Sequence, residues 1–356
     1  MKIALLGDIA LIGRYDRTKD TKISKRISCI KEFVKDCDFV IANQESVLTD
    51  RTTTFSCKGV YLRSAMENVQ TLNEMGVTHV TLANNHIFDY GKHGAEDTKK
   101  ALKEAGITYV GLCDSPQVLR KDDDAIMLDG FCCLSANALN YGETKGSVHL
   151  LTPENIEKFL ADAKEQHCFP IASVHYGLEG LHYPAREHIE LFRSLAEHYD
   201  YVLHGNHPHA MQGYEKRNNS LIIYAQGNLC FDRGETTSIH RFYEETEETR
   251  KGYIVLLEIT HNQIVQYEVI PVTDLSDGIL KRNPAAKNEL NVYCQALQRP
   301  VSEIEKCRTT ELNDQSKKAE KRDLRFYLNR MNYKYIGAYI NGRRHLKSYK
   351  EIMLKH

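Results

Sequence analysis

Residues able to bind a metal ion or to move a proton are clustered in two parts of this 356-residue sequence. In VTHVTLANNHIFDYG, a run rich in β-branched residues ends at Ala83, and five such residues occupy the next seven positions, Asn85, His86 and Asp89 among them. Seven of the sixteen histidines lie between positions 175 and 209. The last two of these seven, His207 and His209, form an H-x-H pair. Such clusters indicate acid–base or metal chemistry.

An H-x-H pair by itself is more often a pair of hydrogen-bonded loop histidines than a metal site. Here it accompanies Asp8, Glu45, Asn85 and His175, each at the end of an apolar run. Carboxylate, amide oxygen and imidazole ligands together suit a divalent ion such as Mn, Fe or Zn, and we expect one or two ions. Such an ion can activate water at neutral pH or polarise a phosphoryl or carbonyl oxygen.

Six short apolar runs lead to these residues. They span 2–8, 38–45, 77–86, 169–177, 201–209 and 221–228. Their interiors are rich in Val, Ile and Leu with little alternation, which predicts strands buried on both faces. Segments with helical periodicity lie between several of them, at 24–37, 64–76, 92–106, 152–166 and 185–199, with Ser64 and Thr152 as N-cap candidates and Gly76 and Gly106 as helix ends.

Alternating strands and helices predict a layered α/β protein with a mostly parallel sheet. Ligands of such sheets bind beyond the carboxyl ends of the strands, so the polar residues of all six runs should converge on one crevice. A hairpin is predicted around His261 and Asn262, and the chain after residue 272 reads as helical. We therefore expect one domain over 1–272 and a helical, basic extension over 273–356.

The charge is unevenly distributed. The whole chain has a formal net charge of −1, whereas residues 317–356 contain 12 Lys and Arg against 3 Asp and Glu. This Tyr-rich basic end suits an acidic polymer, a membrane surface or RNA. No RNA-binding motif accompanies it, so we expect no nucleic-acid partner and favour a solvated tail or a helix packed on the main domain.

The ten cysteines show no C-x-x-C pair, and Cys132 and Cys133 are adjacent, which indicates reduced thiols in a cytoplasmic protein. Asp8 interrupts the apolar N-terminus and argues against a signal peptide. We expect a cytoplasmic protein that a partner could hold at the membrane surface.

The order of the motifs carries a family resemblance. GDIALIGRYD, NQESVLTD, LANNHIFDYGKHG, VHYGLEG, HGNHPHAMQGYE and YAQGNLCFD follow one another between Lys2 and Asp232. In this order they resemble the capsule-synthesis protein CapA family, which includes poly-γ-glutamate synthesis proteins of bacterial capsules. The resemblance implies a calcineurin-like metallophosphoesterase fold, a four-layered α/β sandwich.

The resemblance also implies residue roles. The metal ligands would be Asp8, Glu45, Asn85, His175, His207 and His209. His86 would be the general acid or the stabiliser of the transition state. Asp89 would orient His86, its alternative being a capping carboxylate before the helix over 92–106.

Two positions depart from the phosphoesterase pattern. Ala10 stands where those enzymes have a histidine, and Glu45 stands where aspartate is usual. One metal site of a two-metal centre would then be absent or rebuilt, with Glu179 as a substitute ligand. Substrate contacts are expected from Arg14, Asn43, Glu179 and Asn228, although Arg14 could equally be a solvated loop residue and the asparagines turn formers.

Three functions compete. The first is a metal-dependent, phosphoesterase-like hydrolase that acts on a capsular acidic polymer, such as poly-γ-glutamate or polysaccharide, or on a phosphorylated precursor. The second is a non-catalytic, metal-containing assembly or polymer-binding component of a capsule-synthesis complex, with membrane proteins as partners. The third and weakest is a nucleic-acid phosphodiesterase.

Overall fold

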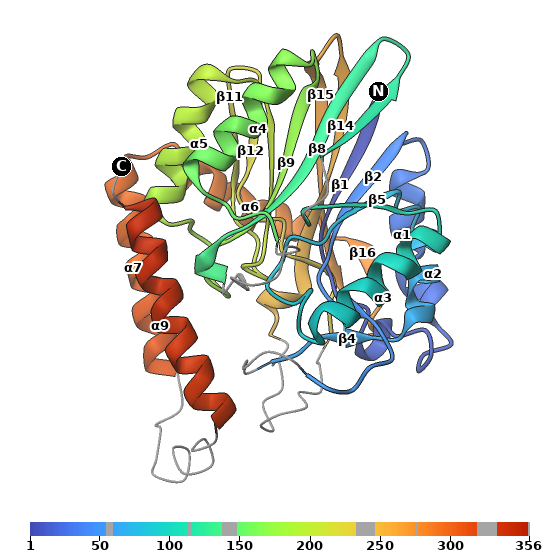
Figure 1. Ribbon diagram of the computed structural model, residues 1–356. Helices are drawn as coiled ribbons and strands as arrows, with labels where there is room; N and C mark the ends of the chain where they lie inside the picture. The colour runs from blue at the N-terminus through green and yellow to red at the C-terminus, as the bar shows by residue number, and fades with distance from the viewer. Residues whose placement is uncertain are drawn as a thin grey trace.

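Two β-sheets face each other in the computed structural model, and helices cover the outer side of each sheet (Figure 1). The structure describes residues 1–54, 60–112, 116–136, 148–232, 246–274, 277–318 and 333–354. Helices α1, α2 and α3 cover one sheet and α4 and α5 cover the other (Figure 1). The four-layered α/β sandwich is thereby confirmed.

The first sheet has its strands in the order β16-β15-β14-β1-β2-β5-β6, with β13 also paired to β1. The parallel core consists of β1 (Lys2–Ile9), β2 (Phe39–Gln44), β5 (His79–Thr81) and β6 (Thr108–Val110). The remaining strands are β13 (Asn228–Cys230), β14 (Lys251–Thr260), β15 (Gln263–Asp274) and β16 (Leu280–Arg282).

The second sheet has the order β11-β12-β10-β9-β8-β7. Its four central strands are parallel: β8 (Asp124–Cys132), β9 (Phe169–His175), β10 (Val202–Asn206) and β12 (Ser220–Ile223). The edges are antiparallel, β7 (Gln117–Lys121) and β11 (Tyr214–Arg217). A separate short pair joins β3 (Val47–Leu48) to β4 (Arg63–Ser64).

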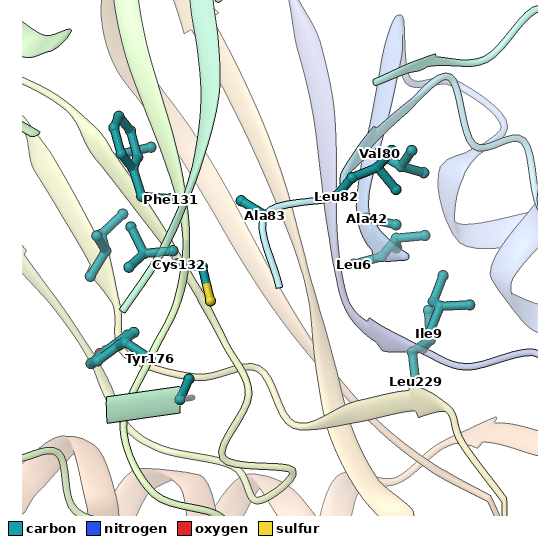
Figure 2. Packing of buried hydrophobic residues seen from close by; sticks show 14 of the residues in the cluster. Leu6, Ile9, Ala42, Val80, Leu82, Ala83, Phe131, Cys132, Tyr176 and Leu229 are labelled. Carbon is teal, nitrogen blue, oxygen red and sulfur yellow. The ribbon is translucent and has the colours of Figure 1, made fainter. Parts of the chain in front are cut away.

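The strands are buried on both faces, as their composition predicts. Alternate residues of β1 enter two different apolar clusters: Ile3 and Leu5 face the second sheet, and Ala4 and Leu6 belong to the other cluster. Figure 2 shows part of the cluster that contains Ala4 and Leu6, with Leu6 and Val80 on the side of the first sheet and Phe131 on β8. A period-2 side-chain pattern thus buries both faces of one strand.

The five predicted helices are present. They are α1 (Ile23–Val34), α2 (Val69–Glu74), α3 (Gly91–Glu104), α4 (Pro153–Glu165) and α5 (Arg186–His198). Thr152 caps α4 by accepting the N–H of Asn155, and Gly76 and Gly106 follow α2 and α3 with φ of +81° and +74°. Ser64 as an N-cap was wrong, because it lies in β4 and its hydroxyl donates to the carbonyl of Leu11.

The end of the described chain is mainly helical, with α6 (Pro284–Leu297), α7 (Val301–Lys318) and α9 (Tyr333–Met353). The predicted hairpin joins β14 to β15 through His261 and Asn262, whose φ values of +50° and +57° suit a type I′ turn. Strand β15 runs through the expected boundary at 272/273, and β16 still belongs to the first sheet. The two-part division stays a prediction.

The eight cysteines within the described segments are free thiols. None of the helices in those segments is long and apolar enough to cross a membrane.

Candidate metal centre

The carboxyl ends of strands from both sheets bring the polar motifs together. Asp8 lies near the end of β1, where its N–H donates to the carbonyl of Gly227. Gly7 is required there, because a Cβ on it would lie 2.2 Å from the same Gly227 oxygen. Glu45 follows β2 and its N–H donates to the carbonyl of Ile9, which holds the two carboxylates on adjacent strand ends. The second sheet contributes His175 at the end of β9.

A chain of hydrogen bonds links four of the predicted site residues. Asn43 Nδ2 donates to Asp8 Oδ1 at 2.7 Å and lies 3.3 Å from His175 Nδ1. His175 Nε2 lies 3.0 Å from Asn85 Oδ1, so two predicted metal ligands contact each other. Asn43 therefore holds both a carboxylate from the first sheet and an imidazole from the second.

Two groups of side chains could each hold a metal ion, because the ligand atoms within each group lie within 4.8 Å of one another. Both groups include Glu45. The first group is Asp8, Glu45 and His209, and the second is Glu45, His175 and His207. Glu45 Oε1 lies 3.4 Å from His209 Nε2 and 3.8 Å from His175 Nε2. One carboxylate thus faces donors of both groups, which is the arrangement expected of a shared ligand.

Glu45 is fully buried, and within the described residues neither of its carboxylate oxygens accepts a hydrogen bond. A buried carboxylate without donors is costly unless a cation or a proton accompanies it. On the facing ring, His209 Nδ1 lies 2.9 Å from Asn228 Oδ1 and donates to it, so Nε2 presents a lone pair to Glu45. A divalent cation between these groups would satisfy both, so the residues fit the implied metal.

The raised pKa of Asp8 also supports a cation at this position. Burial, followed by repulsion from Glu45, raises the pKa of Asp8 to about 7. The N–H of His207, which donates to Asp8 Oδ2 at 3.1 Å, opposes that rise. A cation at this point would favour the ionised carboxylate and offset the cost of burying two acids together.

His86 is oriented by Asp89. Its Nδ1 lies 2.6 Å from Asp89 Oδ2, which also accepts the N–H of Leu62 at 2.8 Å. Because the carboxylate only accepts, Nδ1 carries the proton and Nε2 points into the site, 3.9 Å from Glu45 Oε1. Asp89 lies directly before Tyr90, the N-cap residue of helix α3, and its carboxylate contacts the histidine.

Ala10 supplies no ligand atom. It is fully buried in a small apolar cluster with Ile12, Leu62 and Phe231. Phe231 also packs edge-on against His209, with ring centroids 4.7 Å apart. Apolar packing occupies the position where the phosphoesterase pattern has a histidine.

Glu179 lies at the rim of the site. Its side chain is exposed, yet one of its carboxylate oxygens lies within 4.8 Å of ligand atoms of His207 and His209. Asn228 contacts His209, and its Nδ2 donates to the carbonyl of Thr249. The structure therefore brings both residues to the candidate metal centre, and their substrate-binding role stays a prediction.

Arg14 lies in an ion-pair cluster. Its guanidinium donates to Asp232 Oδ1 at 2.8 Å and to Asp274 Oδ2 at 2.9 Å, and its backbone N–H donates to Asp232 Oδ2. Tyr15 donates to Asp274 as well. An anionic substrate group would compete with these two carboxylates for Arg14.

Two supporting residues carry roles that the sequence did not predict. Asn84 Oδ1 accepts the N–H groups of His86 and Ile87, which fixes the turn that carries the histidine. His204, inside β10, connects the sheets, since its Nε2 lies 2.9 Å from the carbonyl oxygen of Leu6 on β1. A polar residue inside an apolar strand was the only available signal for His204.

Comparisons with known proteins identify the family. A profile described as bacterial capsule synthesis protein PGA_cap matches residues 2–233. Capsule biosynthesis protein CapA of Bacillus anthracis is 26% identical over 314 residues, which covers 83% of this chain and 72% of that protein. PGA biosynthesis protein CapA of Bacillus subtilis (strain 168) is 25% identical over 282 residues, covering 76% and 71%.

Among solved structures, Haemophilus influenzae NAD nucleotidase (NadN) aligns with a TM-score of 0.43 at 12% identity, over 90% of this chain and 68% of that chain. The profile match extends over more than half of the sequence and includes every residue of both Glu45 ligand groups. The chain belongs to the bacterial capsule synthesis protein PGA_cap family.

Proposed function

We propose that this protein is a metal-dependent hydrolase of capsule biosynthesis that acts on an acidic capsular polymer or its phosphorylated precursor. The buried Glu45 carboxylate carries the proposal, because it faces His175 and His209 and accepts no hydrogen bond within the described residues. Burying such a carboxylate costs free energy, so a purely structural role does not explain it. A role as a shared metal ligand does, because the cation would compensate its charge.

The ion would be held by Asp8, Glu45 and His209, with His175 and His207 supplying a second set of ligands around the same Glu45. When bound, a Mn, Fe or Zn ion polarises a substrate oxygen and lowers the pKa of water. Asn43 fixes Asp8 and His175 relative to each other through one amide group. The protein thereby presents preorganised ligands.

His86 would transfer the proton. Asp89 holds the Nδ1 proton of the imidazole, so the proton that moves in the reaction does so at Nε2, which faces Glu45. The ring is almost fully buried, and Asn84 fixes its backbone. A positioned imidazole of this kind typically contributes about 10²- to 10⁴-fold to the rate as a general acid or base.

The substrate class rests on chemistry and on the family. The relatives are described as proteins of capsule and PGA biosynthesis. Without a cation, Asp8 and Glu45 would repel a phosphate or carboxylate group, so an anionic substrate needs the ion as a bridge. An acidic polymer or a phosphorylated precursor fits a site with this requirement.

A non-catalytic, metal-containing assembly or polymer-binding component is the second candidate. Ala10 favours it, because apolar packing replaces one ligand of the phosphoesterase pattern. In that case the ion would bind an acidic polymer without hydrolysing it. Membrane proteins of a capsule-synthesis complex would then be the expected partners.

Metal content and turnover distinguish the two. The purified protein is loaded with Mn²⁺ and assayed with bis(p-nitrophenyl) phosphate and with a poly-γ-glutamate chain. Under the hydrolase proposal His86→Ala keeps the metal and loses turnover, and His207→Ala loses both. His93→Ala, an exposed histidine of α3, is the matched control and should behave as wild type. A wild-type protein that binds Mn²⁺ but turns over neither substrate with any divalent ion would favour the binding component.

A further inference from the structure

The loop that carries Glu179 is held against the metal centre from outside by helix α7. Gln315, on α7, donates its side-chain amide to the carbonyl of Gly180 at 2.7 Å. On the other side of the same residue, the N–H of Gly180 donates to the carbonyl of Pro208 at 2.7 Å. Gly180 is therefore fixed between α7 and the H-x-H segment, directly after Glu179.

Gly180 suits this place for a conformational reason. Its φ is +73°, a value that residues with a side chain rarely adopt. A Cβ at this position would also lie 2.8 Å from Gln315 Nε2. The close approach of α7 to the loop and the turn of the loop toward Pro208 thus depend on the same glycine.

A second contact from α7 lies one turn earlier. Glu311 Oε2 accepts the N–H of His182 at 3.0 Å. The ring of His182 stacks on Tyr293 of α6, with centroids 4.6 Å apart and planes 11° apart, and its Nδ1 lies 2.9 Å from the carbonyl oxygen of Met211. The loop is thus held by two C-terminal helices and by the segment that follows His209.

The held loop places Glu179 beside two metal ligands. Glu179, His207 and His209 form a third ligand group with atoms within 4.8 Å of one another. Unlike the two groups around Glu45, this group has an exposed carboxylate, so it lies on the solvent side of the centre. Helix α7 begins at Val301, beyond residues 2–233 that the family profile matches.

We propose that α7 is a positioning element of the proposed metal centre, which through Gln315 and Gly180 holds Glu179 beside His207 and His209 as an outer ligand. The inference rests on the proposed metal site and extends it to a part of the chain outside the family match. Gln315 is a positioning residue, because it acts only through the loop. Its effect should therefore depend on the presence of the Glu179 carboxylate.

The test is a double-mutant cycle on Mn²⁺ affinity, measured by isothermal titration calorimetry on the full chain. Glu179→Gln should weaken Mn²⁺ binding about 10- to 100-fold, and Gln315→Ala about 10-fold, the range found when groups that orient metal ligands are removed. The double variant should bind no more weakly than Glu179→Gln alone. Asn313→Ala, which removes another exposed amide of α7, is the matched control and should bind as wild type.

Thermal unfolding of the metal-free variants verifies that each is folded. Gln315→Ala with wild-type affinity, or with the same loss of affinity in the Glu179→Gln background, would overturn the positioning role while the proposed site stands. A folded wild-type protein that binds no Mn²⁺ would instead overturn the proposed function and this inference with it.

Discussion

Asp89 Oδ2 lies 2.6 Å from His86 Nδ1 and at the same time accepts the backbone N–H of Leu62 at 2.8 Å. The second bond fixes the carboxylate, and the fixed carboxylate fixes the tautomer of the ring. Asp89 itself is fully buried. The proton on Nδ1 is therefore held in place, and chemistry is left to Nε2 on the side of Glu45.

Asp89→Asn should lower kcat without emptying the metal site. The amide oxygen can still accept the N–H groups of Leu62 and His86, but it lacks the negative charge that stabilises the protonated ring, which should cost about 100-fold in kcat. Mn²⁺ affinity and KM for bis(p-nitrophenyl) phosphate should change little, since Asp89 belongs to neither Glu45 ligand group. Steady-state kinetics and calorimetry measure these quantities.

Asp97→Asn, on helix α3, is the control for the loss of a carboxylate that belongs to none of the ligand groups. It should keep the wild-type kcat. A kcat of Asp89→Asn within about twofold of wild type would show that His86 does not depend on the negative charge of Asp89.

Glu45→Gln should make the metal-free protein more stable and abolish its stabilisation by Mn²⁺. In the metal-free protein the substitution removes a buried charge that repels Asp8 and accepts no hydrogen bond within the described residues, so the free energy of unfolding should rise by about 1 to 3 kcal/mol. The stabilisation that Mn²⁺ gives to the wild-type protein by binding the folded state should be lost.

Thermal unfolding in EDTA and in MnCl₂ tests both halves of this prediction. Glu96→Gln, an exposed residue of α3, should leave both midpoints near those of wild type. If Glu45→Gln were less stable than wild type in EDTA, Glu45 would be a structural residue, and its place as shared ligand would be in doubt.

The convergence of the polar motifs could be predicted because parallel strands deliver their carboxyl ends to one edge of a sheet. The division of those strands between two facing sheets could not be. The interiors of β1 and β9 are equally rich in apolar residues, and which strand pairs with which depends on contacts far apart in sequence. Edge strand β7, with polar residues at both ends, carries too weak a pattern to be found.

At the site, residue type and strand-end position were enough to select Glu45 as a candidate ligand, whereas the role predicted for His86 came from the family resemblance. The contacts that define their surroundings were not predictable. Asp274, which pairs with Arg14, is 260 positions away, and the residue at position 14 follows the first strand just as a substrate-binding arginine would. Sequence shows which side chains reach a strand end, whereas competing partners from distant strands appear only in three dimensions.

Stability should fall as the pH is lowered from neutrality toward 5. Burial lowers the pKa of three histidines, His79, His188 and His204, to about 4 in the folded protein, from an ordinary value of 6.5. Between pH 6.5 and 4 the unfolded chain binds protons that the folded chain does not, so the stability from these groups is complete above 6.5 and is lost as pH falls through this window.

Asp8 works in the opposite direction in the metal-free protein. Its folded pKa of about 7 lies above its ordinary 3.8, so the folded state binds one proton more than the unfolded state in that window. The three histidines outweigh the one carboxyl group, so the free energy of unfolding should fall by roughly 2 to 4 kcal/mol between pH 6.5 and 5. Urea unfolding in EDTA at several pH values measures it.

Asp8→Asn removes the group that binds a proton in the folded state. The free energy of unfolding should then depend more steeply on pH, by an amount that corresponds to about one bound proton. A free energy of unfolding that stays constant between pH 6.5 and 5 would contradict the lowered pKa values. An unchanged slope in Asp8→Asn would contradict the raised pKa of Asp8.

Arg14 offers a test between a structural role and a substrate contact. Its guanidinium bridges Asp232 and Asp274, and the side chain of Asp274 is only 5% exposed. Arg14→Gln leaves these carboxylates without their shared cation, so the free energy of unfolding should fall by about 1 to 3 kcal/mol. KM for bis(p-nitrophenyl) phosphate should stay within about twofold, because the ion pairs already occupy the guanidinium. Urea unfolding and steady-state kinetics on the same preparation decide the matter: a tenfold rise in KM at unchanged stability would mean that Arg14 leaves the carboxylates and binds the substrate anion.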